Sequence, residues 1–225
     1  MTLLFLRLFE ATDDQRFLDL AEMALRRDLD RCVEVADGSL QVDEGGRGMP
    51  YLETGSVGVG LVLRELLRHR EHPDLTAALS RIRRAAEAEL VVCSGLFNGR
   101  AGLIAFLMAT GGEDAVLDRH LSRLAWHVMS YQDHVAFPGD QLMRLSMDLA
   151  TGSAGVLLAV RGARCAGPNR PHASLPDPTR EPRVAATPED RHTMTTTRPL
   201  ARLAMIITAV VAMACVRCPV GGLLW

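Results

Sequence analysis

The sequence predicts an all-α fold in which helix pairs stack side by side into part of an α/α toroid. Two observations predict it. Along residues 1–160, amphipathic helical segments alternate with segments that are apolar on nearly all sides. A similar glycine-bearing motif precedes each apolar segment, at Gly55, Gly99 and Gly152. Besides helices we expect only a short β-hairpin, within residues 134–149.

Three of the expected helices carry apolar residues on one face and charged residues on the other. The apolar faces consist of Leu18, Ala21, Leu25, Leu29 and Cys32 in the first, Leu75, Leu79, Ile82, Ala86 and Leu90 in the second, and Leu117, Leu121, Leu124 and Val128 in the third. Asp13 or Asp14 is expected to cap the first helix, and Pro73 with Asp74 to start the second. This pattern is typical of outer helices with one solvated face.

The intervening segments are Ser56–Leu67, Arg100–Met108 and Ser153–Val160. A helix that is apolar all round is buried on all sides, so we expect these three to form an inner layer. Neighbouring helix pairs would stack inner beside inner and outer beside outer. Because three pairs cannot complete a circle, the sequence predicts an arc with two open flanks.

An internal repeat marks the start of each inner helix. Residues 52–59 (LETGSVGV) match residues 149–156 (LATGSAGV) at six of eight positions, and residues 99–103 (GRAGL) supply an intermediate copy. The repeat glycines are Gly55, Gly58, Gly99, Gly102, Gly152 and Gly155. We expect the first glycine of each copy to permit a sharp turn into the helix and the second to let helix backbones approach closely. Their expected role is structural.

The composition changes near Arg161. Residues 1–160 contain 16 Arg and 23 Asp or Glu, whereas residues 161–225 contain 9 Arg and 4 Asp or Glu. Seven of the eleven prolines lie in residues 168–199, where no apolar periodicity is found. We therefore expect a folded domain, a disordered Pro/Arg-rich linker and an apolar, helical C-terminal segment. Their ranges are 1–160, 161–198 and 199–225.

The apolar run 203–216 is too short to cross a hydrocarbon core, and extending it would bury Arg217. Three interpretations of residues 199–225 therefore stay open: a helix, a membrane anchor, or a tail from a shifted reading frame. Membrane contact is the less favoured of them. Cys215 and Cys218 form a lone C-x-x-C pair that we interpret as incidental.

Composition also excludes some classes of protein. The net charge of −2 argues against a nucleic-acid-binding module. Five cysteines without an N-terminal signal pattern do not indicate a secreted disulfide framework, so we expect a cytoplasmic protein. The chain has no lysine, and this complete use of arginine indicates a GC-rich coding genome, as in actinobacteria.

Three motifs resemble the last three repeats of the lanthionine synthetase C-like family. They are residues 51–58 (YLETGSVG), 95–102 (GLFNGRAG) and 148–155 (DLATGSAG). The closest resemblance is to the C-terminal cyclase domain of class III lanthipeptide synthetases, and it covers residues 1–160. It implies an enzyme that adds a peptide cysteine thiol to dehydroalanine or dehydrobutyrine and closes a lanthionine or labionin ring. The implied partners are a precursor peptide and the rest of a synthetase.

The resemblance also implies where a zinc ion would lie. In zinc-bearing members of the family, one ligand corresponds to Glu53 here and a Cys-His pair corresponds to Phe97-Asn98. All three ligands are absent, so we expect neither zinc nor another cofactor. Cys93 lies four residues upstream of its partner position, and we expect it to be a buried small residue.

Without zinc, the thiol needs a base and the resulting enolate needs an acid. Candidate residues at the loop ends are Tyr51, Glu53, Asn98, Arg100 and Asp148. Glu53 could accept the thiol proton, and Arg100 could stabilise negative charge at a helix start. A structural role stays open for each: Glu53 as a cap or a solvated side chain, Asn98 in a turn, Asp148 as a loop-orienting residue.

The histidines offer no metal site. We expect His69, His72, His120, His127 and His134 to be solvated or locally hydrogen-bonded. The family's acid/base residues from earlier repeats would precede Met1. Three hypotheses therefore stay open: a cyclase that needs another chain for its missing repeats, a non-catalytic fragment that binds a peptide or completes a partner's toroid, and a truncated, inactive gene product. A carbohydrate enzyme would need an aromatic-lined cleft, and aromatics are only 4% of the residues.

Overall fold

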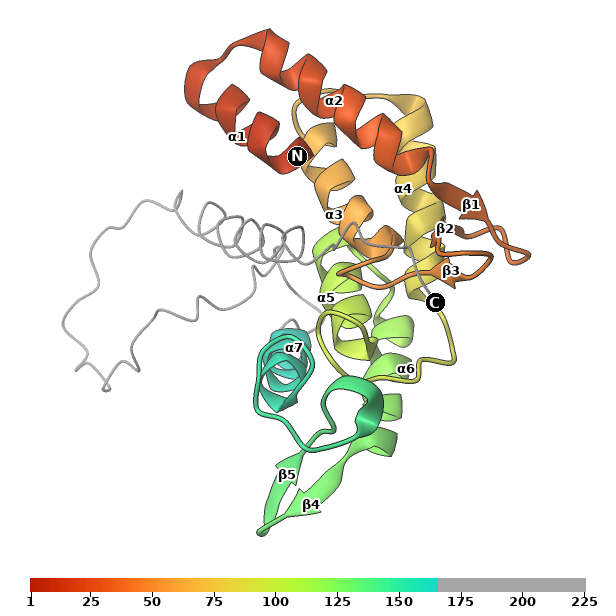
Figure 1. The fold of residues 1–225 in the computed structure, drawn as a ribbon, viewed down its shortest axis with the longest axis vertical. Helices are drawn as coiled ribbons and strands as arrows, with labels where there is room; N and C mark the ends of the chain where they lie inside the picture. Colours follow the sequence, from red (N-terminus) through yellow and green to blue (C-terminus); the bar gives the residue numbers. More distant parts are fainter. Residues whose placement is uncertain (166–225) are drawn as a thin grey trace, which may run out of the picture. The chain divides into compact units, whose positions relative to one another are not determined.

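The computed structural model describes residues 1–165, which form seven α-helices, five short strands and two 3-10 turns (Figure 1). The expected mostly helical fold is confirmed for this part of the chain. The last helix runs from Ser153 to Cys165, past the expected domain end at residue 160. From residue 166 on, the expected linker and the apolar segment lie outside the described residues.

The helices alternate between two layers. Inner helices follow one another, each contacting the next: α1 (Thr2–Thr12), α3 (Ser56–Leu67), α5 (Arg100–Thr110) and α7 (Ser153–Cys165). Outer helices pack against the first three of these in order: α2 (Gln15–Leu29), α4 (Pro73–Ala86) and α6 (Asp114–Leu124). Figure 1 shows the succession from α1 to α7. Helix α1 has no counterpart among the predicted helices, so the inner layer has four members in the described residues.

The core lies between the two layers. Leu63 and Leu66 of α3, Ile82 of α4 and Ile104 and Phe106 of α5 are fully buried. Gly60 permits this packing, since a Cβ there would lie 2.8 Å from Ile82 Cγ2 and 2.9 Å from Phe106 Cε2. Burial of such apolar side chains is the main stabilising contribution to a helical fold.

The apolar faces predicted for the outer helices are correct at their central residues, but their last residues lie beyond the ends of the helices. Leu18, Ala21 and Leu25 are buried, and the Asp14 side chain caps α2 by accepting from the Arg16 N–H. The first face was extended too far at Cys32, which lies in a strand because α2 ends at Leu29. Leu90 and Val128 also follow the ends of their helices, and they are 81% and 44% exposed.

The hairpin occurs earlier in the chain than predicted. Strand β4 (Met129–Tyr131) pairs antiparallel with β5 (His134–Ala136). The turn residues Gln132 and Asp133 both have positive φ, of 48° and 60°, as a two-residue hairpin turn requires. The predicted range, residues 134–149, therefore contains only the second strand of this hairpin. The two 3-10 turns are η1 (Ala125–His127) and η2 (Asp140–Leu142).

A three-stranded antiparallel sheet was not predicted. It contains β1 (Cys32–Glu34), β2 (Leu40–Asp43) and β3 (Gly48–Met49) in that order. Leu40 and Val42 of β2 are buried, and β2 contacts α4. The sequence signal for β2 was the short alternation of apolar and polar residues from Leu40 to Asp43. It is bounded by Gly38 and by glycines 45 and 46, all with positive φ. The sheet connects α2 to the loop that begins α3.

Candidate functional site

The three motif loops lie side by side at the N-terminal ends of α3, α5 and α7. Leu52 N and Glu53 N donate to Phe97 O at 3.0 and 3.1 Å, and Phe97 N donates to Ala150 O at 2.9 Å. Glu53, Phe97 and Ala150 occupy the same position in the three motifs. We call this arrangement of residues 50–55, 94–99 and 147–152 the loop ladder. Each loop meets the next at the same backbone position, so α3, α5 and α7 start at one end and run in one direction.

The first glycine of each motif lies where the loop folds back on itself. A Cβ at Gly55, Gly99 or Gly152 would lie 2.4 to 2.6 Å from the carbonyl oxygen of the residue six positions earlier. Gly55 and Gly99 have extended φ values of −129° and −160°. A side chain is therefore excluded by crowding at these positions, and the left-handed backbone region plays no part.

The second glycine of each motif lies against the leucine of its own loop, and those of the second and third motifs also lie against the preceding loop. A Cβ at Gly58, Gly102 or Gly155 would lie 2.1 to 2.3 Å from the carbonyl oxygen of its own loop's leucine. In addition, it would lie 3.3 Å from Leu52 Cβ at Gly102, and 2.8 Å from Leu96 Cβ at Gly155. Both leucines belong to the preceding loop. These glycines thus hold successive loops in register. The atoms closest to them belong to loops, whereas the sequence predicted a close approach of helix backbones.

Glu53 and Asn98 join the first two loops through their side chains. Asn98 Nδ2 donates to Glu53 Oε2 at 2.7 Å. Glu53 is exposed and Asn98 is half-buried, with its Oδ1 buried and without a protein hydrogen bond among the described residues. The pair lies at two of the three positions where the resembling family carries its zinc ligands.

Tyr51 and Cys93, two residues before Glu53 and five before Asn98 in the sequence, lie near each other and are neutral at pH 7. Burial raises the pKa of Tyr51, the nearby Cys93 adds to the rise, and the Arg100 charge opposes it. Burial also raises the pKa of Cys93, as does the neighbouring carboxylate of Asp140. Tyr51 can therefore donate a proton. Cys93 is a half-buried thiol and does not have the lowered pKa of a reactive one.

Arg100 is turned away from Glu53. Its side chain is buried, with Nη1 donating to His120 Nδ1 at 3.0 Å and Nη2 donating to Glu89 O at 3.1 Å. Burial, followed by the Arg100 charge, lowers the pKa of His120 to about 4. A guanidinium can only donate, so His120 Nδ1 is unprotonated. This contact anchors the start of α5 to α6.

The sequence predicted His120 to be solvated or locally hydrogen-bonded and did not predict its burial. The available signal was its position four residues after Val116 and four before Leu124, on the face of α6 that turns inward. A histidine at such a position needs a hydrogen-bond partner inside the protein. Here that partner is Arg100.

Asp148 is held within its own loop. It accepts from Thr151 N at 2.7 Å, from Thr151 Oγ1 and from Ser146 Oγ. These hydrogen bonds lower the pKa of Asp148 to about 2. Within residues 1–165, no hydrogen bond or ion pair joins it to Glu53, Asn98 or Arg100. The side chain borders a hollow of about 240 Å³, and its contacts are those of a loop-orienting residue.

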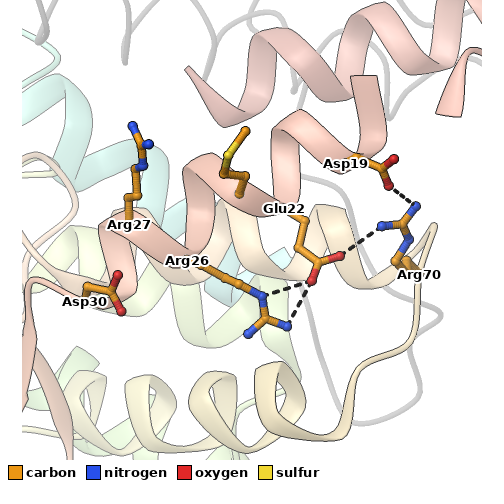
Figure 2. A pocket seen from close by; sticks show the side chains of 7 residues that line it. Asp19, Glu22, Arg26, Arg27, Asp30 and Arg70 are labelled. Carbon is orange, nitrogen blue, oxygen red and sulfur yellow. Dashed lines mark hydrogen bonds and ion pairs between the residues drawn. The ribbon is translucent and has the colours of Figure 1, made fainter. Parts of the chain in front are cut away.

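A larger surface hollow, of about 470 Å³, lies beside α2 (Figure 2). In it, Glu22 accepts from Arg70 Nη1 at 3.0 Å and from Arg26 Nε at 2.9 Å, and Arg70 donates to Asp19 at 2.7 Å. His72 Nε2 lies 3.1 Å from Glu22 Oε2, the oxygen that also accepts from Arg70. Figure 2 shows this chain of ion pairs between α2 and the turn after α3. These groups satisfy one another's hydrogen bonds and charges, so we interpret the network as a structural one that holds α2 to the turn after α3.

The donor set does not fit zinc. At the positions that correspond to ligands stand one carboxylate, one phenyl ring and one amide, from Glu53, Phe97 and Asn98, whereas zinc requires three or four N, S or carboxylate donors. The described residues hold no group of three or more His, Cys, Asp or Glu that could bind a metal ion. Likewise, no helix within residues 1–165 is both long and apolar enough to cross a membrane.

The chain is 53% identical over 163 residues to a probable SapB synthase of Streptomyces coelicolor. The match covers 70% of this chain and 18% of that protein. This chain is a homologue of part of that synthase. It spans less than a fifth of the length of the relative. A comparison with known family profiles finds none that matches.

Proposed function

We propose that residues 1–160 form part of the cyclase domain of a class III lanthipeptide synthetase and contribute to thioether ring formation without zinc. Two observations support the proposal. The three motif loops repeat one geometry, as repeats of one domain should, and half of the aligned residues are shared with a probable SapB synthase. The single observation that carries it is the Glu53–Asn98 contact at the positions of the family's zinc ligands.

The stack of inner and outer helices is then one arc of an α/α toroid. Within the described residues each inner helix packs against the next, which is the arrangement that an α/α toroid repeats around its ring. The loop ladder lies at one end of this arc, where loops from successive repeats could surround a peptide. In this arrangement the other repeats come from further polypeptide.

The chemistry of the step is an addition without oxidation or reduction. Glu53 accepts the proton of a peptide cysteine thiol, and the thiolate attacks the β-carbon of dehydroalanine or dehydrobutyrine, forming the C–S bond. The electron pair of the C=C bond moves to the α-carbon as an enolate. Tyr51, whose pKa is raised, donates its phenolic proton there. Asn98 holds the Glu53 carboxylate through Nδ2.

The roles of the other candidates follow from their contacts. Arg100 is buried beneath the loops, so its charge acts on Tyr51 through space and not by touching substrate. Asp148 orients the third loop. Both are positioning residues in this proposal.

The test incubates the full chain with a dehydrated precursor peptide that carries a free cysteine. Ring closure leaves the peptide mass unchanged, so iodoacetamide is added afterwards to label any thiol that remains. The expected result is loss of labelled peptide with time, and tandem mass spectra that lack fragments from inside the ring. Labelling that stays complete, both with the chain alone and with the matching synthetase regions added, contradicts catalysis.

A non-catalytic role is the second candidate, and the open end of the loop ladder favours it. Leu149, the third motif leucine, is 40% exposed, and within residues 1–165 no glycine of a fourth motif lies against its Cβ. Ala150 N, the next donor of the ladder, makes no backbone hydrogen bond there. A fragment that binds precursor peptide or completes another chain would show a measurable affinity for the dehydrated peptide by calorimetry. Iodoacetamide would still label the peptide thiol completely.

A further inference from the structure

The loop between β5 and the third motif is closed at its base. In residues 138–145, which we call the tied loop, Pro138 and Leu145 pair as an isolated antiparallel bridge. Ser94 Oγ of the second motif loop donates to Pro138 O at 3.5 Å, in a buried contact. The base of the tied loop is therefore fixed to the second motif loop, and the third motif loop follows it directly in the chain.

The tip of the tied loop combines backbone strain with exposed apolar side chains. Gln141 and Leu142 have positive φ values of 52° and 58°, in a turn of the kind that Asn-Gly normally makes. This conformation costs free energy for any residue with a Cβ, and such strain is concentrated at functional sites. Leu142 is 44% exposed and Met143 is 81% exposed. The tip thus presents two apolar side chains to solvent, and their own burial does little to offset the strain.

The hollow of about 240 Å³ lies between this tip and the third motif loop. Its lining includes Asp140, Met143 and Arg144 from the tied loop, and Asp148 and Thr151 from the motif loop. The last two bind each other. Asp140 and Arg144 are exposed, and neither side chain forms a hydrogen bond or ion pair with another residue of the range 1–165. The hollow therefore offers one unpaired acceptor and one unpaired donor beside an apolar side chain.

These three groups match a length of peptide. A peptide presents an N–H donor and a C=O acceptor at each residue. The Asp140 carboxylate can accept from such an N–H, and the Arg144 guanidinium can donate to such a C=O. Met143 can then pack against an apolar side chain of the same peptide, because methionine is flexible and adapts to different shapes. A wholly apolar ligand would leave both charged groups without partners.

The tied loop is also close to the candidate reacting groups. The Cys93 thiol interacts electrostatically with both the Asp140 carboxylate and the Tyr51 side chain. Tyr51 lies two residues before Glu53 in the first motif loop. In the proposed reaction, Tyr51 protonates the α-carbon of the dehydro residue. A peptide held by the tied loop would therefore place its dehydro residue on the Tyr51 side of the site.

We propose that the tied loop binds the part of the precursor peptide that carries dehydroalanine or dehydrobutyrine, and that Met143 selects an apolar side chain next to that residue. The inference rests on the proposed function for its ligand, a dehydrated peptide. Asp140 and Arg144 hold the peptide backbone, so they act on every sequence alike. Met143, with Leu142 beside it, supplies the preference between sequences.

The test measures the binding of two short synthetic peptides to the full chain by fluorescence anisotropy. Both peptides carry an N-terminal fluorescein and a central dehydroalanine, and both lack cysteine, so no ring can form. Leucine flanks the dehydroalanine on both sides in one peptide, and serine does so in the other. The wild-type chain is expected to bind the leucine peptide about 10-fold more tightly, because only leucine buries apolar surface against the tied loop.

Four variants separate the contributions. Met143→Ser should weaken binding of the leucine peptide about 5-fold and leave binding of the serine peptide unchanged. Arg144→Gln should weaken binding of both peptides by the same factor. Leu142→Gly adopts the positive φ without strain, so it should unfold at a urea concentration no lower than the wild type while its preference for leucine falls. Met23→Ser is the matched control, because Met23 is 48% exposed on α2, and it should bind both peptides as the wild type does.

Equal affinity of the wild-type chain for the two peptides overturns the proposal, as does a Met143→Ser variant that keeps the full preference for leucine. Absence of binding by either peptide up to about 1 mM overturns it as well. Failure of the proposed catalysis is a separate result, because these peptides contain no thiol. A leucine preference without thiol loss from a cysteine-bearing peptide contradicts catalysis alone, and thiol loss without a leucine preference contradicts this inference alone.

Discussion

Arg100 of α5 donates a hydrogen bond from Nη1 to Nδ1 of His120 on α6 at 3.0 Å, and both side chains are almost completely buried. The contact crosses from the inner to the outer layer directly beneath the loop ladder. It forces His120 to be neutral, because a protonated ring would place two cations in contact inside the protein. A buried arginine is thus held without a carboxylate.

The first prediction concerns acid stability. The pKa of His120 is lowered to about 4 in the folded chain, from 6.5, so at intermediate pH the unfolded chain binds the proton and the folded chain does not. The free energy of unfolding should therefore fall as pH drops from about 6.5 to about 4, by up to about 3 kcal/mol. Urea unfolding followed by circular dichroism at several pH values measures this slope.

His120→Gln retains an acceptor for Arg100 and removes the titrating ring. Its unfolding free energy should change less between pH 6.5 and pH 4 than that of the wild type. His134→Gln, at an exposed position in β5, should keep the wild-type slope. Equal slopes in all three proteins would show that His120 is not the group responsible.

The second prediction concerns the motif glycines. A Cβ at Gly102 would lie 2.2 Å from Leu96 O, which is backbone and cannot swing aside. Gly102→Ala should therefore destabilise the fold by more than about 2 kcal/mol. Gly45→Asn is the control, since nothing lies within 4 Å of a Cβ there and asparagine tolerates its positive φ. If Gly102→Ala unfolds at the same urea concentration as this control, the loops are not crowded as described.

The third prediction concerns the ion pairs beside α2. Burial would raise the pKa of Glu22, but hydrogen bonds from Arg70 and Arg26 outweigh it and lower the pKa. Glu22→Gln removes the charge that joins them and should cost about 1 to 2 kcal/mol of unfolding free energy. Glu71→Gln, an exposed carboxyl without a partner in the described part of the chain, should cost nothing measurable. Thermal unfolding at low and high salt separates the two, because only the first should respond to screening.

The sequence predicted those features that depend on short-range pattern. Helices α3, α5 and α7 start at Ser56, Arg100 and Ser153 as expected, since an all-round apolar run after a glycine motif is a strong local signal. Helix α1 was overlooked, although residues 2–12 are nearly as apolar. The sheet from β1 to β3 was overlooked because strands this short carry little periodicity, and contacts with α4 stabilise it.

The candidate site was only partly accessible from the sequence. Motif alignment placed Glu53 and Asn98 in equivalent loops, and the structure brings them to 2.7 Å. The direction of the Arg100 side chain could not be predicted, because it depends on His120 and Glu89 O, which reach it through tertiary packing. The ring hydrogen bond of His120 likewise becomes visible only when α6 is placed beside α5.

The central claim is that Glu53 accepts the thiol proton, and the rate of thiol loss from a dehydrated precursor peptide tests it most directly. Glu53→Gln keeps the size of the side chain and can still meet Asn98, while losing the base. This variant should lower the rate at least about 100-fold at neutral pH, as removal of a general base does. Glu71→Gln should leave the rate unchanged. Equal rates for Glu53→Gln and Glu71→Gln would contradict the account.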